Sequence, residues 1–459
     1  MIVAKFGGSS LADAAQLRKV HDIVAGDPER RVVVVSAPGK RYGGDQKVTD
    51  MLIGCAEAHM AGQNSKAGIN ALLGRYSQIV MDLGLDQSIC RRIESDLNDR
   101  LASYGASITD ADEFMDLMKA AGEDNSAKLV AAYFKSRGMA AEYVDPKDAG
   151  FLLSENFGNA HVLPETYGNV AAALGGRHGV AVFPGFFGYT PSGKVIAFSR
   201  GGSDITGSIL AAALGASLYE NFTDVDHVYS VDPKLVRDPS PITELTYREM
   251  RELSYAGFSV YHEDALVPVF TKGIPVRIKN TNNPKAPGTA ILARRDFSKS
   301  QPVTGISAAA GFTSINMSKL LMNSEVGFGR KALSILEDEG ISFEHMPSGI
   351  DNISIILKEA AAPPDAQKRI MRRLMSELSV DEISVRKNLA IVMLVGEGML
   401  NTIGTTARAS SALARAGINI EIINQGASEV SLMFGIDEKD ASQAVKCLYG
   451  EFFSKPSRP

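Results

Sequence analysis

Residues 2–10 read Ile-Val-Ala-Lys-Phe-Gly-Gly-Ser-Ser, and the interpretation of the chain starts from them. The apolar run predicts a buried strand that two glycines end, and the spacing after it predicts a helix over 11–25, capped by Ser9 or Ser10. A Gly-Gly turn between a strand and a helix start leaves backbone N–H groups free to bind an anion, and Lys5 would add a positive charge. The same turn also occurs in α/β proteins without a ligand, so this stretch alone leaves a phosphate site open.

The bulk composition is typical of a soluble globular chain. The 459 residues, 45% hydrophobic and 22% charged, are enough for roughly two to four domains, each with its own core. The net charge of −5 and the lack of a dense Lys/Arg run exclude a nucleic-acid surface. No apolar run approaches the roughly 18–20 residues that span a bilayer, and the apolar start is interrupted too early for a signal peptide. We therefore expect a cytoplasmic protein without membrane contact.

Cysteine and histidine spacing does not indicate a metal site. The three cysteines, Cys55, Cys90 and Cys447, lie far apart in the sequence and form no CxxC pair. The seven histidines show no paired ligand spacing either. We therefore expect neither a disulfide framework nor a metal ion held by protein ligands.

A second strand and a second glycine-containing turn follow the first. Residues 31–36 contain four consecutive valines, typical of a parallel strand buried on both faces, and residues 37–40 form the turn Ala-Pro-Gly-Lys. Residues from 51 to 137 have helical spacing that is interrupted at 120–126, where Glu123 is expected at the start of a further helix. At that place Glu123 either complements the helix dipole or takes part in a charged site.

The arrangement at the N-terminus recurs later in the chain. Residues 199–204 read Ser-Arg-Gly-Gly-Ser-Asp and lead into a helix predicted over 205–214, so that Arg200 places a guanidinium beside a second Gly-Gly turn. Strands predicted over 180–183 and 218–222 also end in polar or glycine-containing turns. Because ligands of open α/β sheets bind at the carboxyl ends of strands, these turns predict a site for a highly charged ligand. Its candidate charged groups are Lys5, Glu123, Arg200, Asp204 and Asp224.

Beyond a linker-like segment at 280–304, the chain contains an internal repeat. Each copy has the order β-α-β-β-α-β, although the second copy lacks its last strand. A spare strand predicted over 303–308 supplies the missing element, so we infer that the first copy is inserted within the second. The first copy is predicted as strand 312–318, helix 327–338, strand 340–342, strand 353–357, helix 365–378 and strand 383–385. The second copy is predicted as strand 389–395, helix 402–416, strand 417–420, strand 430–434 and helix 439–449.

Six motifs together resemble those of aspartate kinases, the enzymes of the amino-acid-kinase fold that phosphorylate L-aspartate with MgATP. The two C-terminal repeats are similar to the paired ACT domains of that family, which bind amino-acid effectors. The resemblance covers essentially the whole chain and implies an α/β fold. An αβα sandwich with a mainly parallel sheet is expected in residues 1–295, followed by ferredoxin-like βαββαβ ACT domains at 303–386 and 387–453. The motifs lie at residues 5–10, 36–50, 122–123, 200–204, 223–225 and 229–233.

The resemblance implies a reaction. MgATP would phosphorylate the β-carboxylate of L-aspartate to 4-phospho-L-aspartate, the first step of lysine, threonine and methionine biosynthesis, with Mg²⁺ held mainly by phosphates and water. Because a carboxylate is already ionised at pH 7, positioning and charge neutralisation take the place of a general base. By the same resemblance, Arg200 would hold the α-carboxylate of the substrate and Glu123 its α-ammonium group.

The resemblance also implies the residues of the site. Catalytic roles fall to Lys5, Gly8 and Asp204. Substrate binding falls to Ser36, Thr49, Glu123, Arg200, Gly201 and Ser203. Nucleotide binding falls to Lys5, Gly7, Gly8, Ser9, Thr223, Asp224, Tyr229 and Lys234.

Regulation by lysine, threonine or both is implied for the ACT region. Glu344 suits a lysine ammonium group, although it can also be read as an ordinary solvated strand residue. Because ACT domains generally pair across subunits, a homodimer or a dimer of dimers is expected, and the effector would act through a two-state shift. The implied effector-binding residues are Met322, Ser324, Glu325, Gly327, Phe328, Ser342 and Glu344.

Two departures from the family pattern concern the nucleotide contacts. Ser259 stands where many relatives carry a lysine that reaches ATP, and Lys272 and Lys279 are candidate replacements. Lys234 stands where the family often has arginine, a change that keeps the charge but loses the planar fork. These departures affect the expected nucleotide contacts and leave the expected reaction unchanged.

Other functional classes fit the sequence less well. Another kinase of the same fold, acting on glutamate, acetylglutamate, carbamate or UMP, is disfavoured by the pairing of Glu123 with Arg200 and by the twin ACT repeats. A non-catalytic amino-acid sensor could have lost Lys5, Arg200 and Asp204 freely, yet all three are present. A fused homoserine dehydrogenase is not expected, because no Gly-x-Gly-x-x-Gly unit follows Tyr449.

Overall fold

The computed structural model describes residues 1–199, 201–258, 261, 263–297, 301–426 and 430–454. The chain divides into two units. Unit 1 comprises Met1–Val228, Pro241–Arg251 and Ser259–Arg295, and unit 2 comprises Tyr229–Ser240, Glu252–Phe258 and Asp296–Pro459. Two elements, β8 (Val228–Tyr229) and α8 (Tyr247–Tyr255), run across a boundary between these segments.

Unit 1 is built on an eight-stranded sheet in the order β10-β12-β11-β7-β1-β2-β4-β3. All neighbouring pairs are parallel except β11 with β12. The mainly parallel sheet expected from the sequence is therefore confirmed. Its strands are β1 (Ile2–Phe6), β2 (Arg30–Val35), β3 (Ala141–Tyr143), β4 (Val180–Pro184), β7 (Leu218–Thr223), β10 (Glu244–Thr246), β11 (Val276–Asn280) and β12 (Thr289–Leu292).

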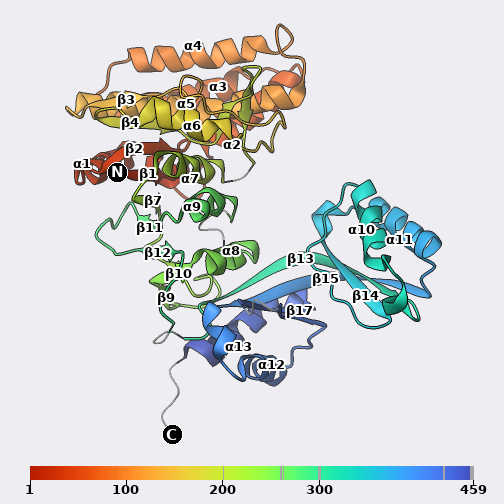
Figure 1. Ribbon diagram of the computed structural model, residues 1–459. Coiled ribbons are helices and arrows are strands. Elements are labelled where there is room, and N and C mark those ends of the chain that lie inside the picture. Colours follow the sequence, from red (N-terminus) through yellow and green to blue (C-terminus); the bar gives the residue numbers. More distant parts are fainter. Residues whose placement is uncertain (200, 259–260, 262, 298–300, 427–429, 455–459) are drawn as a thin grey trace. The chain divides into compact units, whose positions relative to one another are not determined.

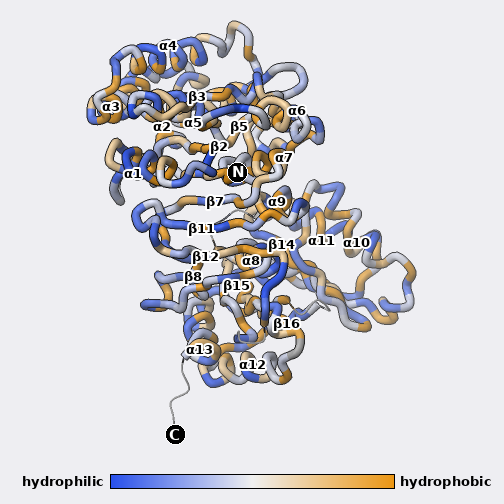
Figure 2. The backbone as a smooth tube through the Cα atoms, turned by 60° about the vertical axis from the view of Figure 1, so that its left-hand side comes forward, coloured by the Kyte–Doolittle hydropathy of each residue, from blue (hydrophilic) through white to orange (hydrophobic). Residues whose placement is uncertain are grey.

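Helices of unit 1 pack on both faces of this sheet. The long helices α3, α4 and α5 lie side by side (Figure 1). The tube of α4 is mostly hydrophilic in colour (Figure 2), and its apolar residues Ile93 and Leu97 are buried. No described helix combines the length and apolar character needed to cross a bilayer. The helices of this unit are α1 (Ala14–Ala25), α2 (Val48–Met60), α3 (Lys66–Asp82), α4 (Ser88–Ser103), α5 (Ala111–Ser136), α6 (Glu165–Leu174), α7 (Gly202–Leu214) and α9 (Leu266–Lys272), and a hairpin joins β5 (Phe187–Tyr189) to β6 (Val195–Ala197).

Strand β1 separates an apolar face from a charged one. Ala4 and Phe6 belong to the hydrophobic core that also contains side chains of α1 to α5, and the Phe6 ring stacks on Phe222 with centroids 4.8 Å apart. Because side chains alternate along a strand, Lys5 points to the opposite face, where Asp204 of α7 meets it. The strand thus anchors a lysine between two buried apolar neighbours.

The turn after β1 differs from its prediction. Residues 8–11 form a 3₁₀ turn, and α1 begins at Ala14, with Asp13 as its cap through a 2.9 Å bond from the Gln16 N–H. The expected cap by Ser9 or Ser10 is therefore wrong. Ser10 is buried, and its hydroxyl is 2.7 Å from that of Thr281.

The expected break near Glu123 is also wrong. Helix α5 runs without interruption from Ala111 to Ser136, so Glu123 lies in its interior. A Cβ on Gly122 would lie 2.8 Å from the Cβ of Ala37, which shows how closely the helix approaches the turn after β2. The residues that suggested a helix start are buried and held by tertiary contacts, which outweigh their low helix propensity.

Unit 2 contains one antiparallel sheet in the order β14-β13-β15-β17-β16. Strands β13 (Gly305–Ser318) and β15 (Glu382–Val395) are each 14 residues long and run beside each other from one helix pair to the other (Figure 1). One core lies under α10 (Phe328–Asp338) and α11 (Pro364–Leu378), the other under α12 (Thr405–Arg415) and α13 (Ala441–Phe453). The shorter strands are β14 (Asn352–Lys358), β16 (Ile422–Asn424) and β17 (Ser431–Asp437).

Several elements predicted for unit 2 are merged or displaced. The strands expected at 303–308 and 312–318 are one strand, β13, and those at 383–385 and 389–395 are one strand, β15. No strand forms at 340–342 or at 417–420, because Gly340 and Gly417 end their helices with φ of +69° and +72° and the backbone then continues irregularly. In the second copy the strand begins later, as β16.

The turns after β1 and β2 touch through two glycines. The Gly39 N–H donates to the Gly8 carbonyl at 2.8 Å. A Cβ on Gly39 would lie 2.5 Å from the Gly8 carbonyl carbon and 2.7 Å from the Ser9 nitrogen, so only glycine allows this contact. The contact fixes the spacing of the two turns at the carboxyl ends of adjacent strands.

The substitution Gly39→Ala is expected to separate these turns and to lower the free energy of unfolding by about 1–3 kcal/mol, as overpacking does in a tight site. Gly43→Ala is the matched control, because a Cβ there meets nothing within 4 Å. Urea denaturation of both variants measures the difference. Equal midpoints for the two variants would contradict the role assigned to the contact.

Candidate functional site

Lys5 and Asp204 form a buried ion pair at the carboxyl end of β1. Lys5 is 8% exposed, and its Nζ lies 2.5 Å from Asp204 Oδ1. Asn221, which sits beside Lys5 in the register of β7, donates to the same carboxylate at 2.8 Å. The ammonium group is therefore held in one place by a partner that is itself oriented by a second hydrogen bond.

Asp204 lies in the first turn of α7, and the backbone before it is strained in a way that glycine tolerates. Gly201, at the start of α7, has a φ of +72°. A Cβ on Gly185 would lie 2.7 Å from the side chain of Ser203, so the turn after β4 presses against the start of this helix. Arg200, expected to bind the substrate carboxylate, lies outside the described residues.

Glu123 is a buried carboxylate with an oxygen that has no partner. The residue is 5% exposed, and its Oε2 forms no hydrogen bond. Burial raises the pKa of Glu123 to about 8, while a hydrogen bond from the Ala37 backbone and the charge of Lys5 lower it to a smaller extent. The carboxyl therefore favours its protonated form at pH 7, and a nearby cation would stabilise its charged form.

Ser36 and Thr49 lie on either side of the turn after β2. The Ser36 N–H donates to the Phe6 carbonyl at 3.2 Å, which ties this turn to β1. Thr49 is in the first turn of α2 and is half-buried. Both polar side chains therefore belong to the segment that also carries Ala37, the backbone partner of Glu123.

Arg75 of α3 braces this segment and was missed by the sequence analysis. Its buried guanidinium donates to the carbonyls of Gly39 and Gln46 and lies 2.9 Å from Asp45 Oδ2. These contacts fix the loop that follows β2. The position of that turn therefore depends on Arg75, which lies about 35 positions further along the chain. A lone arginine at helical spacing gave no local sign of this role.

The nucleotide candidates are divided between the two units. Thr223 ends β7, and its hydroxyl donates to Asp224 Oδ1 at 3.2 Å in unit 1. Tyr229 and Lys234 belong to unit 2 and line a cavity of about 510 Å³ with Arg237. Among the described residues, His, Cys, Asp and Glu side chains form no group of three or more suited to a metal ion.

The two candidate replacements for the lysine expected at Ser259 are both in unit 1, and Ser259 itself lies outside the described residues. Lys279 sits on β11 with its ammonium 6.0 Å from the centroid of the Phe222 ring, and burial lowers its pKa. Lys272 is the last residue of α9 and is exposed.

The effector candidates at the start of α10 have mixed environments. Met322 and Phe328 are buried in the core under α10 and α11, while Ser324 is exposed. Glu325 lies 2.6 Å from Lys319 and 2.8 Å from Lys331, and hydrogen bonds from these lysines lower its pKa to about 2. Gly327 precedes α10 with a φ of +80°.

Glu344 and Ser342 follow α10 on an irregular segment. Glu344 is half-buried, accepts a hydrogen bond from the Tyr255 hydroxyl and lies 3.4 Å from the ammonium of Lys358. Glu344 is therefore not an ordinary solvated residue. Ser342 is exposed.

The titration of Glu123 predicts a measurable change in stability. Since its folded pKa of about 8 exceeds the ordinary value of 4.5, its stabilising contribution is full below pH 4.5 and is lost as pH rises toward 8. Glu123→Gln removes this loss. The stability of the variant relative to the unchanged protein is expected to rise with pH, by up to about 1.4 kcal/mol per pH unit in that window.

Thermal unfolding of both proteins between pH 5 and pH 9 measures this difference. Asp112→Asn, at an exposed position in the first turn of the same helix, is the control. If the curve of Glu123→Gln stays parallel to that of the unchanged protein, the raised pKa is contradicted.

Comparison with known proteins identifies the family. Residues 1–280 match the amino acid kinase family, and residues 392–452 match the ACT domain. Aspartokinase 3 of Bacillus subtilis (strain 168) is 54% identical over 454 residues, which cover 99% of each chain. The resemblance seen in the sequence motifs is therefore confirmed over the full length.

Solved structures agree with this assignment. The crystal structure of Clostridium acetobutylicum aspartate kinase has a TM-score of 0.83 at 38% identity and covers 98% of this chain and 100% of its own. E. coli aspartokinase III in complex with aspartate and ADP has a TM-score of 0.81 at 25% identity, and its complex with lysine and aspartate has 0.75 at 26%, each covering 99% of this chain and 100% of its own. The chain belongs to the amino acid kinase family and, within it, to the aspartokinases.

Proposed function

We propose that this protein transfers the γ-phosphoryl group of MgATP to the β-carboxylate of L-aspartate and so forms 4-phospho-L-aspartate. The observation that carries the proposal is a buried ammonium group and a buried carboxyl group near the carboxyl ends of the central strands. Lys5 is a fixed cation, and Glu123 is a buried carboxyl whose Oε2 has no partner. An amino acid would place its ammonium group beside Glu123 and a carboxylate near Lys5, so that each of these buried groups gains a partner of opposite charge.

The reaction needs charge neutralisation more than proton transfer. An oxygen of the β-carboxylate forms a bond to the γ-phosphorus as the bond from that phosphorus to the ADP oxygen breaks. The nucleophile is ionised at pH 7, so no base has to remove a proton from it. Lys5 stabilises the charge on the transferring group, and Asp204 with Asn221 keeps the lysine in place.

Substrate recognition is proposed to use both turns and α5. Glu123 binds the α-ammonium group and gives up its proton when it does so, because a nearby cation favours the charged carboxylate. Arg200 holds the α-carboxylate. The remaining polar edges of the substrate are held by Ser36, Thr49, Gly201 and Ser203.

The nucleotide is proposed to bind at the glycine turn of β1 and at the end of β7. Exposed backbone N–H groups and Lys5 favour the phosphates there. Mg²⁺ enters with ATP and supplies further charge neutralisation, held mainly by phosphate oxygens and water. Beside Lys5, the proposed nucleotide contacts are Gly7, Gly8, Ser9, Thr223, Asp224, Tyr229 and Lys234.

Regulation is proposed to act through unit 2. The proposed ACT domains span 303–386 and 387–453, with strand 303–308 completing the second. The assignment of strand 303–308 to the second domain is supported by the register of β13 and β15, in which Gly305 to Ala309 pair with Val395 to Ile391. Lysine, threonine or both bind near Glu344 and the start of α10, and a solved complex of E. coli aspartokinase III with lysine supports this choice. Pairing of ACT domains would make the protein a homodimer or a dimer of dimers.

Turnover trapped as aspartyl hydroxamate tests the reaction and its regulation together. With MgATP, aspartate is expected to give product and glutamate is not, and lysine or threonine is expected to suppress it. Lys5→Ala is expected to lower kcat by on the order of 100-fold or more, because it removes the cation at the transferring group. Lys66→Ala, an exposed residue at the start of α3, is the control.

Two outcomes would contradict the proposal. Normal kcat in Lys5→Ala would remove that residue from the mechanism. Binding of an amino acid without any product in the unchanged protein would indicate a sensor built on a kinase fold.

A further inference from the structure

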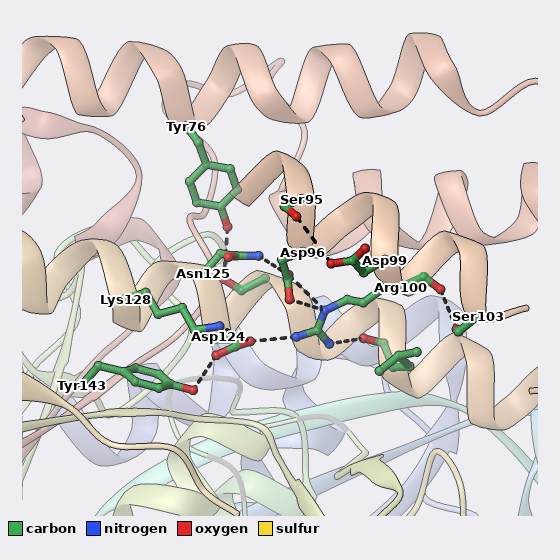
Figure 3. A network of polar contacts seen from close by, with 12 residues as sticks. Tyr76, Ser95, Asp96, Asp99, Arg100, Ser103, Asp124, Asn125, Lys128 and Tyr143 are labelled. Atoms are coloured by element: carbon green, nitrogen blue, oxygen red, sulfur yellow. Dashed lines mark hydrogen bonds and ion pairs between the residues drawn. The ribbon is translucent and has the colours of Figure 1, made fainter. Parts of the chain in front are cut away.

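A network of polar side chains binds the part of α5 that contains Asp124 and Asn125 (Figure 3). The hydroxyl of Tyr76, from α3, donates to the Gly122 carbonyl at 3.1 Å. One residue after Glu123, the carboxylate of Asp124 is bound from α4 and β3, and Asn125 donates to Asp96 of α4 at 2.8 Å. The residues on both sides of Glu123 are therefore tied to other elements, whereas Glu123 itself reaches toward Ala37.

Asp124 is the centre of this network. The residue is 4% exposed, and its carboxylate accepts hydrogen bonds from Arg100 at 2.7 Å, from Lys128 at 2.9 Å and from the Tyr143 hydroxyl at 2.7 Å. These donors come from α4, from α5 and from β3. None of the three belongs to the turns that carry Lys5, Asp204 or the glycines, so the network is separate from the groups expected to touch the substrate.

Arg100 donates hydrogen bonds to α5 at two positions. Its Nη2 donates to Asp124, and its Nη1 donates to the Leu117 carbonyl at 2.8 Å. These two positions are seven residues apart, about two helical turns. Its Nε is 3.0 Å from both oxygens of Asp96, which lies on α4 with it. The planar guanidinium thus fixes both the height and the rotation of α5 against α4.

The rotation of α5 decides where the Glu123 carboxyl lies. Neighbouring residues on a helix point about 100° apart, so a turn of the helix that moves Asp124 also moves Glu123. Since Gly122 approaches Ala37 with no room for a Cβ, the helix has little freedom on that side either. The Glu123 carboxyl is held between a close glycine contact and a charged network.

We propose that the Arg100–Asp124 pair, with Asp96 and Tyr143, is a positioning device that aims Glu123 at the ammonium group of the amino-acid substrate. The inference rests on the proposed function, because it takes that ammonium group as the partner of Glu123. Arg100 and Asp124 touch no reactant; they act through the helix. Their loss weakens binding of the amino acid and leaves nucleotide binding unchanged.

The substitution Asp124→Asn tests this role in the full-length protein. It keeps the shape of the side chain and removes the charge that Arg100 and Lys128 share. The KM for aspartate is expected to rise on the order of tenfold, since a displacement of about 1 Å at a binding group has effects of this size or larger. The KM for ATP is expected to stay within about twofold, because none of these residues lies on a nucleotide segment.

Asp116→Asn is the matched control. Asp116 is a buried carboxylate on the same helix, two turns earlier, 1% exposed and bound by the backbone N–H groups of Gly158 at 2.7 Å and Ala197 at 3.0 Å. Its loss disturbs the fold to a similar degree but does not fix the rotation at Glu123. An equal rise in the KM for aspartate in both variants would show that the network contributes only to general stability. That result would overturn the proposal.

A double variant separates action through Glu123 from an independent effect. In a Glu123→Gln background, Asp124→Asn is expected to add no further rise in the KM for aspartate, because both changes act on one contact. Multiplying effects would overturn the proposal. Aspartate-dependent product from the unchanged protein establishes the proposed function separately, so failure of either idea can be told from failure of the other.

If Asp124→Asn does not fold, Tyr143→Phe provides the test. It removes one hydrogen bond to Asp124 and leaves every charge in place. A rise of several-fold in the KM for aspartate with an unchanged KM for ATP supports the positioning role. An unchanged KM for aspartate in this folded variant contradicts it.

Discussion

The burial of the Lys5 ammonium and of the Glu123 carboxyl near the carboxyl ends of β1 and β2 is the constraint on which unit 1 depends. The Lys5 ammonium lies 2.5 Å from the carboxylate of Asp204. Glu123 has no such partner, so burial favours its neutral form and raises its pKa to about 8. A substrate that brings an ammonium group restores the charged form, and the cost of burying the carboxyl is then offset by binding. This arrangement suits the zwitterionic substrate of the proposed function.

The two long strands of unit 2 belong to both of its halves. Strands β13 and β15 pass through both halves, and each half adds its own outer strand, β14 or β17, and its own pair of helices. The core under α10 and α11 and the core under α12 and α13 therefore share one ladder of hydrogen bonds. Within this unit Glu344 is already engaged by Tyr255 and Lys358, so an effector that binds Glu344 has to rearrange these contacts.

The sequence predicted the parts of the site that are local. The strand 2–6, the valine strand after it and the Gly-Gly turn before Asp204 all follow from short patterns, and the structure has them. The interior position of Glu123 could not be predicted, because a Gly-Glu-Asp-Asn run has low helix propensity and its helical form is supported by contacts with residues far away in the sequence, such as the packing of Gly122 on Ala37. Asn221 and Arg75 were missed for the same reason: each acts on residues far away in the sequence. The strands expected at 340–342 and 417–420 failed because apolar residues after a helix-ending glycine can be buried without pairing.

Calorimetric titration of aspartate at pH 7, in two buffers of different ionisation enthalpy, tests the central claim most directly. The account predicts that the unchanged protein releases protons as it binds aspartate, since Glu123, with its pKa raised by burial to about 8, is protonated before binding and ionised after it. Glu123→Gln should bind aspartate more weakly and release no proton. Binding without proton release in the unchanged protein, or equal release in both proteins, would contradict the claim that Glu123 is the buried acceptor of the substrate ammonium group.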